Sequence, residues 1–301
     1  MTTVKQFLNT TVVCAALACQ SAHGGIDAKL FPGFEDYSDE AIRLHGLAEL
    51  FPSRVVFEDP KLVTSTESRV ASRVDDLPRA IKYIRLYRLD EAEAVLAEFQ
   101  AHPALILDFR FLKSEHAAIE TLGCLAPEQW TDGLTTVGTV PEDLIEPSIS
   151  AATPRDTPAI VLCNRETAGP FEAILHKLQE SGAIIAVGEP TAGRTGFYEK
   201  TVHGAWILNG EIRPDSDTSL VGVGFQPRIQ LELDAEENYL SYHLYEAGTT
   251  MTQLLRKENA TGSESKQEIK GDRVIIEPDR ILQRGVDIIA ALKILQQQPE
   301  L

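Results

Sequence analysis

Short, continuous apolar runs are the feature that most constrains how this 301-residue chain can fold. They occupy residues 103–109, 159–163 and 183–187. Runs of this length without polar alternation are typical of strands buried on both faces of a parallel sheet. Parallel strands need crossover connections, which helices usually supply. The pattern therefore predicts an α/β fold with right-handed βαβ units.

The segments around these runs carry the matching signals. An alternating β-branched and aromatic strand is expected at 81–87, and a β-rich portion from 202 to 233. Prolines recur through 126–158, which predicts a loop, and the polar segment 256–272 predicts an exposed loop. Helices are expected where apolar residues recur every three or four positions: 38–50, 90–100, 116–125, 170–180 and 279–297.

The charge balance excludes some classes of partner. The chain has 45 acidic and 28 basic side chains, a formal net charge of −17. Nucleic acid and anionic lipid surfaces need a basic face, so neither is expected to bind. The seven histidines are scattered and none has ligand spacing, so no metal site is expected. No stretch beyond the N-terminus reaches the roughly 20 apolar residues that span a bilayer.

The first two dozen residues resemble an export signal. Lys5 precedes an apolar run at 12–19, and Ala22-His23-Gly24 provides a small-x-small cleavage site. We expect a signal peptide over 1–24, an N-terminal helical or irregular segment over 25–75, and a core domain over 76–301, in an exported, periplasmic or extracellular protein. An N-terminal core helix and a lipoprotein anchored at Cys19 are the alternatives.

Cysteine usage leaves one question open. Cys14 and Cys19 lie in the signal segment, so only Cys124 and Cys163 remain for the mature chain. Both stand in apolar contexts, where a buried thiol is common. The sequence allows either a disulfide between them or two buried thiols.

The order of motifs resembles a known family. The segments IKYIRLYRL, PALILDFR and PAIVLCNRETAGPFEAILHKLQESGAIIAVGEPTAGRTG follow one another as in the tail-specific (C-terminal-processing) serine peptidases. Asn209-Gly210, GVGFQPRIQLEL and the final helix DRILQRGVDIIAALKIL continue the likeness, although Arg228 stands where the family has Asp. The resemblance covers about 76–295 and implies a crotonase-like α/β core.

The same resemblance assigns site positions. The family cleaves amides with a Ser–Lys pair, in which a neutral lysine takes the serine's proton. Its Ser-Ala-Ser-Ala-Ser-Glu motif corresponds to 167–172, which places Gly169 at the nucleophile, and Arg194 falls at the general base. Glu180 corresponds to an orienting acid of some members. Arg110, Ala168 and Gly193 stand where the resemblance implies ligand contact.

These positions lack the standard chemistry. Glycine has no nucleophilic side chain, and an arginine side chain does not lose its proton in proteins. After Asp108-Phe109-Arg110 the family has an Asn and paired glycines that help form the oxyanion hole, whereas this chain has Phe111-Leu112-Lys113-Ser114. The sequence therefore predicts a pseudopeptidase.

Two local alternatives remain. Thr167 is a candidate substitute nucleophile, with Glu172 or Glu180 as its base, which would give an active but atypical serine-type peptidase. A Thr before Gly-Pro more often bonds locally at a helix start. Arg194 is either a turn residue that pairs with a carboxylate or an anion clamp near a helix N-terminus.

The expected ligands follow from the same comparison. Only about 50 residues precede 76 after the signal, too few for the family's PDZ module. We expect no cofactor, and a peptide, a protein chain end or a small apolar ligand in the former active-site cleft. The oligomeric state is left open.

Export gives the first test. Expressed in a bacterium with its own N-terminus, the protein should reach the periplasm or the membrane fraction, shortened by about 2 kDa if it is cleaved after Gly24. Fractionation followed by mass spectrometry measures both. Full-length protein found solely in the cytoplasm would contradict the expectation.

Overall fold

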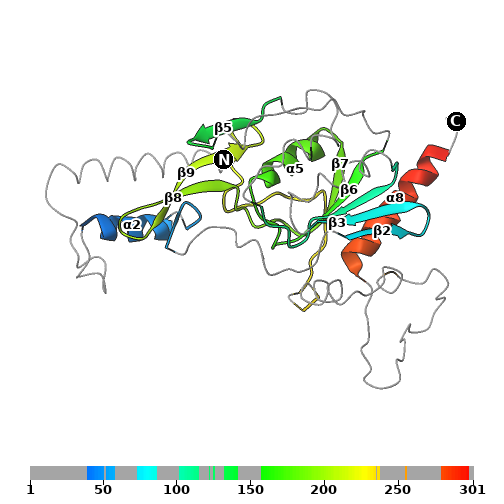
Figure 1. The fold of residues 1–301 in the computed structure, drawn as a ribbon, viewed down its shortest axis with the longest axis horizontal. Helices are drawn as coiled ribbons and strands as arrows, with labels where there is room; N and C mark the ends of the chain where they lie inside the picture. Colours follow the sequence, from blue (N-terminus) through cyan, green and yellow to red (C-terminus); the bar gives the residue numbers. More distant parts are fainter. Residues whose placement is uncertain are drawn as a thin grey trace, which may run out of the picture. The chain divides into compact units, whose positions relative to one another are not determined.

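The computed structural model divides the chain into two compact units. One unit is Met1–Pro60 with Tyr198–Leu208, and the other is Lys61–Phe197 with Asn209–Leu301 (Figure 1). The domain boundary expected at 75/76 stays a prediction. The described residues are 39–50 (side chains from 44), 52–57, 73–86, 102–114, 122, 125, 132–141, 157–234, 236–237, 255 and 279–297 (backbone only at 297).

The smaller unit is a helix beside short strands. Helix α2 (Asp39–Leu50) begins one residue after the predicted start, and strand β1 (Val55–Val56) pairs antiparallel with β9 (Trp206–Arg213). Strand β8 (Gly196–Lys200) also pairs with β9. Three buried side chains form this unit's core: Leu44, Val55 and Ala205.

The larger unit contains the predicted sheet. Its six strands have the order β10-β7-β6-β4-β3-β2, parallel except for β2, which pairs antiparallel with β3 as a hairpin. The strands are β2 (Arg73–Leu77), β3 (Ile81–Arg85), β4 (Leu105–Asp108), β6 (Ala159–Cys163), β7 (Ile184–Gly188) and β10 (Ile229–Gln230). The predicted mixed α/β architecture is confirmed.

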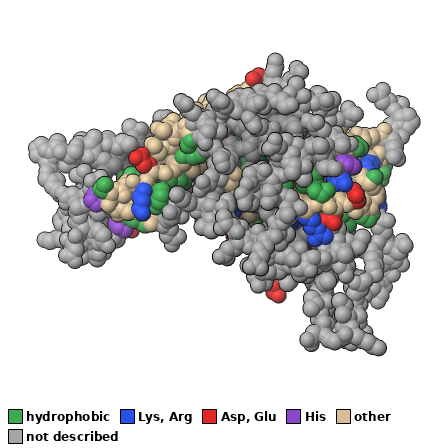
Figure 2. All heavy atoms as spheres, viewed as in Figure 1, with side chains coloured by type: hydrophobic (Ala, Val, Ile, Leu, Met, Phe, Trp, Pro, Cys, Tyr) green, Lys and Arg blue, Asp and Glu red, His purple; other side chains and the backbone are tan. Residues whose placement is uncertain are grey.

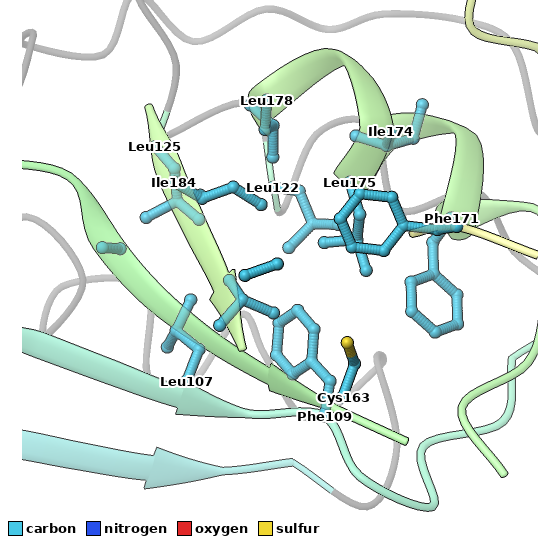
Figure 3. Close-up of a cluster of buried hydrophobic side chains, with 14 of the residues drawn as sticks. Leu107, Phe109, Leu122, Leu125, Cys163, Phe171, Ile174, Leu175, Leu178 and Ile184 are labelled. Atoms are coloured by element: carbon cyan, nitrogen blue, oxygen red, sulfur yellow. The ribbon is translucent and has the colours of Figure 1, made fainter. Parts of the chain in front are cut away.

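Two helices bury opposite faces of this sheet. Successive strand residues point to opposite faces, and β6 divides accordingly. Val161 and Cys163 pack in one apolar cluster with helix α5 (Phe171–Glu180), whose Phe171, Leu175 and Leu178 point into it (Figure 3). Ile160 and Leu162 pack in a second cluster with helix α8 (Arg280–Gln297). The apolar runs are continuous because both faces are covered.

Most predicted elements occur within two residues of their expected bounds. The helices expected at 90–100 and, for most of its length, 116–125 lie outside the described residues, as do the signal segment 1–24 and the loop 256–272. The loop expected over 126–158 is wrong in part, because strand β5 (Thr135–Gly138) pairs antiparallel with β9. Thr135, Thr136 and Val137 are β-branched, and the prolines around them obscured this short run.

The remaining sequence expectations concern cysteine and surface. Cys163 is a free, buried thiol whose pKa is raised by burial, and Cys124 lies outside the described residues.

Among the described helices, none is long and apolar enough to cross a membrane. On the face drawn in Figure 2, acidic and basic side chains lie close together over β2, β3 and α8. Ion pairs in these strands include Arg73–Asp75 and Lys82–Asp76.

The β2–β3 hairpin turn carries backbone strain. Arg79 and Ala80 have positive φ values of 66° and 52°, a conformation that costs residues with a Cβ atom about 1–2 kcal/mol each. Their carbonyl oxygens accept hydrogen bonds from the Lys293 ammonium on α8. The closing helix therefore holds a turn that the sequence by itself disfavours.

This strain is testable with glycine. Ala80→Gly should raise the free energy of unfolding by about 0.5 kcal/mol, because relief of the strain exceeds the added entropy of the unfolded chain. Chemical denaturation measures the change. The control Ala291→Gly, in the exposed face of α8, should lower stability by about 1 kcal/mol. Equal losses of stability in both variants would contradict the interpretation that the turn is strained.

Candidate functional site

The candidate site lies where three neighbouring parallel strands end. Segment 109–114 follows β4, turn 164–170 leads from β6 into α5, and turn 189–195 follows β7. Ligands of open α/β sheets bind outside these carboxyl ends. The fold brings the backbone amides of Gly169, Gly193 and Arg194 together, since all three donate to one carboxylate.

The carboxylate of Glu172 connects these segments. It is completely buried and accepts four hydrogen bonds. The amide of Gly169 donates to it over 3.0 Å, that of Gly193 over 3.0 Å and that of Arg194 over 3.1 Å. The fourth donor is the hydroxyl of Thr191. Burial raises the pKa of Glu172, and the four hydrogen bonds act in the opposite direction.

Residue 169 has no room for a side chain. Gly169 has a φ of 145°, and a Cβ atom built there lies 2.1 Å from the carbonyl oxygen of Ser114. Segment 112–114 is fixed in this place by a bridge to Ala168, whose amide donates to Leu112 and whose carbonyl accepts from Ser114. A serine at 169 would therefore have to displace this backbone.

The residue after Gly169 removes an oxyanion donor. In hydrolases with a nucleophile at a strand-to-helix turn, the amide of the following residue holds the oxyanion. Here that residue is Pro170, which has no N–H, and the amide of Gly169 already donates to Glu172. The sequence alone shows Pro170, which also suits the first turn of the helix expected at 170–180.

The structure displays Arg194 on the surface. Its backbone is held by Glu172 while its side chain is exposed. The anion-clamp interpretation, in which the Arg194 guanidinium holds a ligand carboxylate, stays a prediction. The Gly169 amide at the start of α5 is not available to such a ligand, because it donates to Glu172. The alternative carboxylate partner is Glu172, but it contacts the Arg194 amide rather than the guanidinium.

Glu180 is not brought to the site. It lies at the other end of α5, 11 residues from Gly169, which corresponds to about 16 Å along a helix. Its carboxylate is half exposed and pairs with Lys177 at 3.3 Å. The geometry gives Glu180 no contact through which to orient a group at 169.

Thr167 is buried and satisfied. Its hydroxyl donates to the carbonyl of Phe109 over 2.9 Å and accepts from the amide of Asn164 over 3.1 Å. Its exposed fraction is 0%. A nucleophile must reach a substrate carbonyl, so this arrangement favours the local, structural role.

Arg110 is part of a buried charge network instead of a ligand surface. Its guanidinium binds Asp108 and also reaches Asp279 over 2.7 Å, the residue that caps α8. Arg85 and the Tyr83 hydroxyl also face Asp108, at 3.8 and 2.7 Å. Burial by itself raises the pKa of Asp108, but the charges of Arg110 and Arg85 and these hydrogen bonds outweigh it and lower that pKa to about 2.

Comparisons with known proteins find distant structural similarity. No protein-family model and no curated protein matches the sequence. Solved structures that resemble it include a photosystem II D1 C-terminal processing protease, with 19% identity over 54% of this chain and 48% of that one, at a TM-score of 0.41. The chain thus matches about half the length of that protease.

Two further structures show similar likeness. A lipoprotein from Streptococcus agalactiae has 16% identity over 63% of this chain and 74% of its own, at a TM-score of 0.42. A protein from Parabacteroides merdae, described as a candidate peptidase, has 14% identity over 75% and 67%, at a TM-score of 0.44. At such identities and TM-scores the likeness says nothing of this chain's activity.

The Asp108 network predicts an acid-sensitive fold. Because the pKa of Asp108 is lower in the folded than in the unfolded chain, its stabilisation is complete above about pH 4 and is lost as pH falls toward 2. The loss should amount to about 2 kcal/mol. Denaturation at several pH values should show this slope in the wild type and not in Asp108→Asn. The control Asp287→Asn, an exposed position on α8, should keep the slope.

The crowding at residue 169 gives a second test. Gly169→Ser should lower the free energy of unfolding by about 3 kcal/mol or more, because the new Cβ meets Ser114 and φ is unfavourable. Gly182→Ser is the matched control, since its φ is 78° but nothing lies within 4 Å of its Cβ position. That variant should lose only about 1 kcal/mol. Wild-type stability of Gly169→Ser would refute the closed geometry.

Proposed function

We propose that this protein is an exported homologue of the tail-specific serine peptidases that binds a peptide and does not hydrolyse it. The order of its motifs supports the family and a crotonase-like core, and the N-terminal segment 1–24 supports export, with lipidation at Cys19 as the alternative. The observation that carries the non-catalytic assignment is the carbonyl of Ser114, which lies where a nucleophile's Cβ would be.

Three further features support the same conclusion. Arg194 cannot serve as a general base, because a guanidinium stays protonated. Pro170 supplies no amide to an oxyanion. Glu172 takes up the amides of Gly169, Gly193 and Arg194. The positions that correspond to nucleophile, base and oxyanion donor are thus each occupied by a group that cannot carry out that step.

The surface beside the closed site supports peptide binding. Gly193 lies against the turn 220–224, with its Cβ position 2.7 Å from the amide of Val223. Val223 is 62% exposed, and the neighbouring Arg194 is exposed as well. A basic and an apolar side chain on adjoining turns suit an extended peptide with an acidic residue near an apolar one. Of the ligands that the sequence suggests, this geometry favours an extended peptide over a protein chain end or a small apolar ligand.

Turnover separates this function from an active peptidase. The purified protein should neither degrade fluorescein-labelled β-casein nor react with a fluorophosphonate probe, because residue 169 offers no nucleophile and Thr167 is buried. Gel analysis with in-gel fluorescence reports both. Casein cleavage that Thr167→Ala abolishes would establish the atypical peptidase instead.

Binding is tested on the same substrate. Fluorescence anisotropy should show labelled casein bound by the wild type and bound about fivefold more weakly by Arg194→Ala, the loss typical of one exposed charge contact. Arg284→Ala, an exposed position on α8 across the sheet, changes the net charge equally and should bind as the wild type does. Equal affinities of all three proteins would contradict recognition at Arg194.

A further inference from the structure

Glu172 makes more contacts than its place in the helix requires. A glutamate near the start of a helix commonly accepts one amide bond from the residue at the helix start, as it does from Gly169. The other three donors belong to the turn 191–194, about 20 residues later in the chain. Helix capping explains the hydrogen bond from Gly169. The three hydrogen bonds from the turn 191–194 need another explanation.

That explanation is the shape of the turn. The amides of Thr191 and Ala192 donate to backbone carbonyls, of Phe225 and Thr167. The next two amides, of Gly193 and Arg194, both donate to Glu172. The N–H groups in the half of the turn that carries Arg194 are therefore bonded to a side chain, whereas those of Thr191 and Ala192 are bonded to backbone carbonyls.

The opposite side of this turn meets the turn that carries Val223. The amide of Gly222 donates to the carbonyl of Gly193 over 2.8 Å. The Thr191 hydroxyl, which donates to Glu172, accepts the amide of Phe225 over 2.7 Å. If Glu172 is displaced, the positions of the Arg194 and Val223 side chains therefore change with it.

We propose that Glu172 is a positioning residue, which holds the turn 191–194 so that Arg194 is displayed beside Val223 for the peptide. This inference rests on the proposed function. Glu172 is fully buried, so a peptide at the surface cannot reach it and its effect on binding passes through Arg194.

The chemistry of the donors requires a carboxylate. Three N–H groups and one O–H group converge on two oxygens, and each oxygen receives two of them. The amide of a glutamine replaces one oxygen by an NH₂ group, which donates and does not accept. Glu172→Gln therefore leaves at least one amide donor facing another donor.

The test uses the full-length wild type and variants of Glu172 and Arg194, with labelled β-casein as the probe. Glu172→Ala should weaken casein binding about as much as Arg194→Ala does, roughly fivefold. The double variant should bind no more weakly than Arg194→Ala alone, because both changes remove one contact. Sodium formate, which supplies the missing carboxylate, should restore binding to Glu172→Ala and not to Arg194→Ala. Sodium chloride at equal ionic strength and Glu232→Ala, an exposed charge change, are the controls.

Hydrogen exchange keeps the inference testable without casein. Amides 193 and 194 should exchange faster in Glu172→Ala and recover in formate, whereas amides 191 and 192 should stay protected. If the wild type does not bind casein, the proposed function fails, and this exchange pattern still decides whether Glu172 holds the turn. If Glu172→Ala does not fold even in formate, Glu172→Gln replaces it. It should speed exchange at either amide 193 or amide 194, because these two bond to different oxygens and the glutamine keeps one of them, while amides 191 and 192 stay protected. Additive binding losses, or equal exchange across 191–194, would overturn the inference.

Discussion

The rest of the site depends on one buried carboxylate. Glu172 has no exposed surface, and an uncompensated charge in that position would be strongly destabilising. Its four hydrogen bonds compensate for the lost water, and all four donors come from the two turns that follow β6 and β7. The positions of these turns are therefore fixed to each other, which leaves no freedom to rebuild a catalytic arrangement by small movements.

A second buried charge network fixes the third segment of the site. Asp108 ends β4, and its partner Arg110 also binds Asp279 at the start of α8. The segment that continues from Arg110 places the Ser114 carbonyl against Gly169. Helix α8, strand β4 and residue 169 are thus linked through these contacts. The absence of a side chain at 169 is therefore accompanied by a backbone that leaves no room for one.

The sequence could predict much of this because local patterns carry it. Buried parallel strands are read from continuous apolar runs such as Ala159–Cys163, and α5 from the spacing of Phe171, Ile174 and Leu178. The missing chemistry at Gly169 and Arg194 is also visible in single residues. Strand β5 was missed because its pairing with β9 is a distant contact that four residues do not reveal.

The sequence by itself determined which chemical groups are present, namely a glycine, a proline and an arginine at positions 169, 170 and 194. Tertiary structure decided where the remaining groups point. The sequence allows Glu172 as a base for Thr167, yet folding directs it to the amides of a turn about 20 residues away. Arg110 was expected to meet a ligand, yet folding pairs it with Asp108 and Asp279. The physical reason is that buried charges must find partners, and only the fold brings those partners within hydrogen-bond distance.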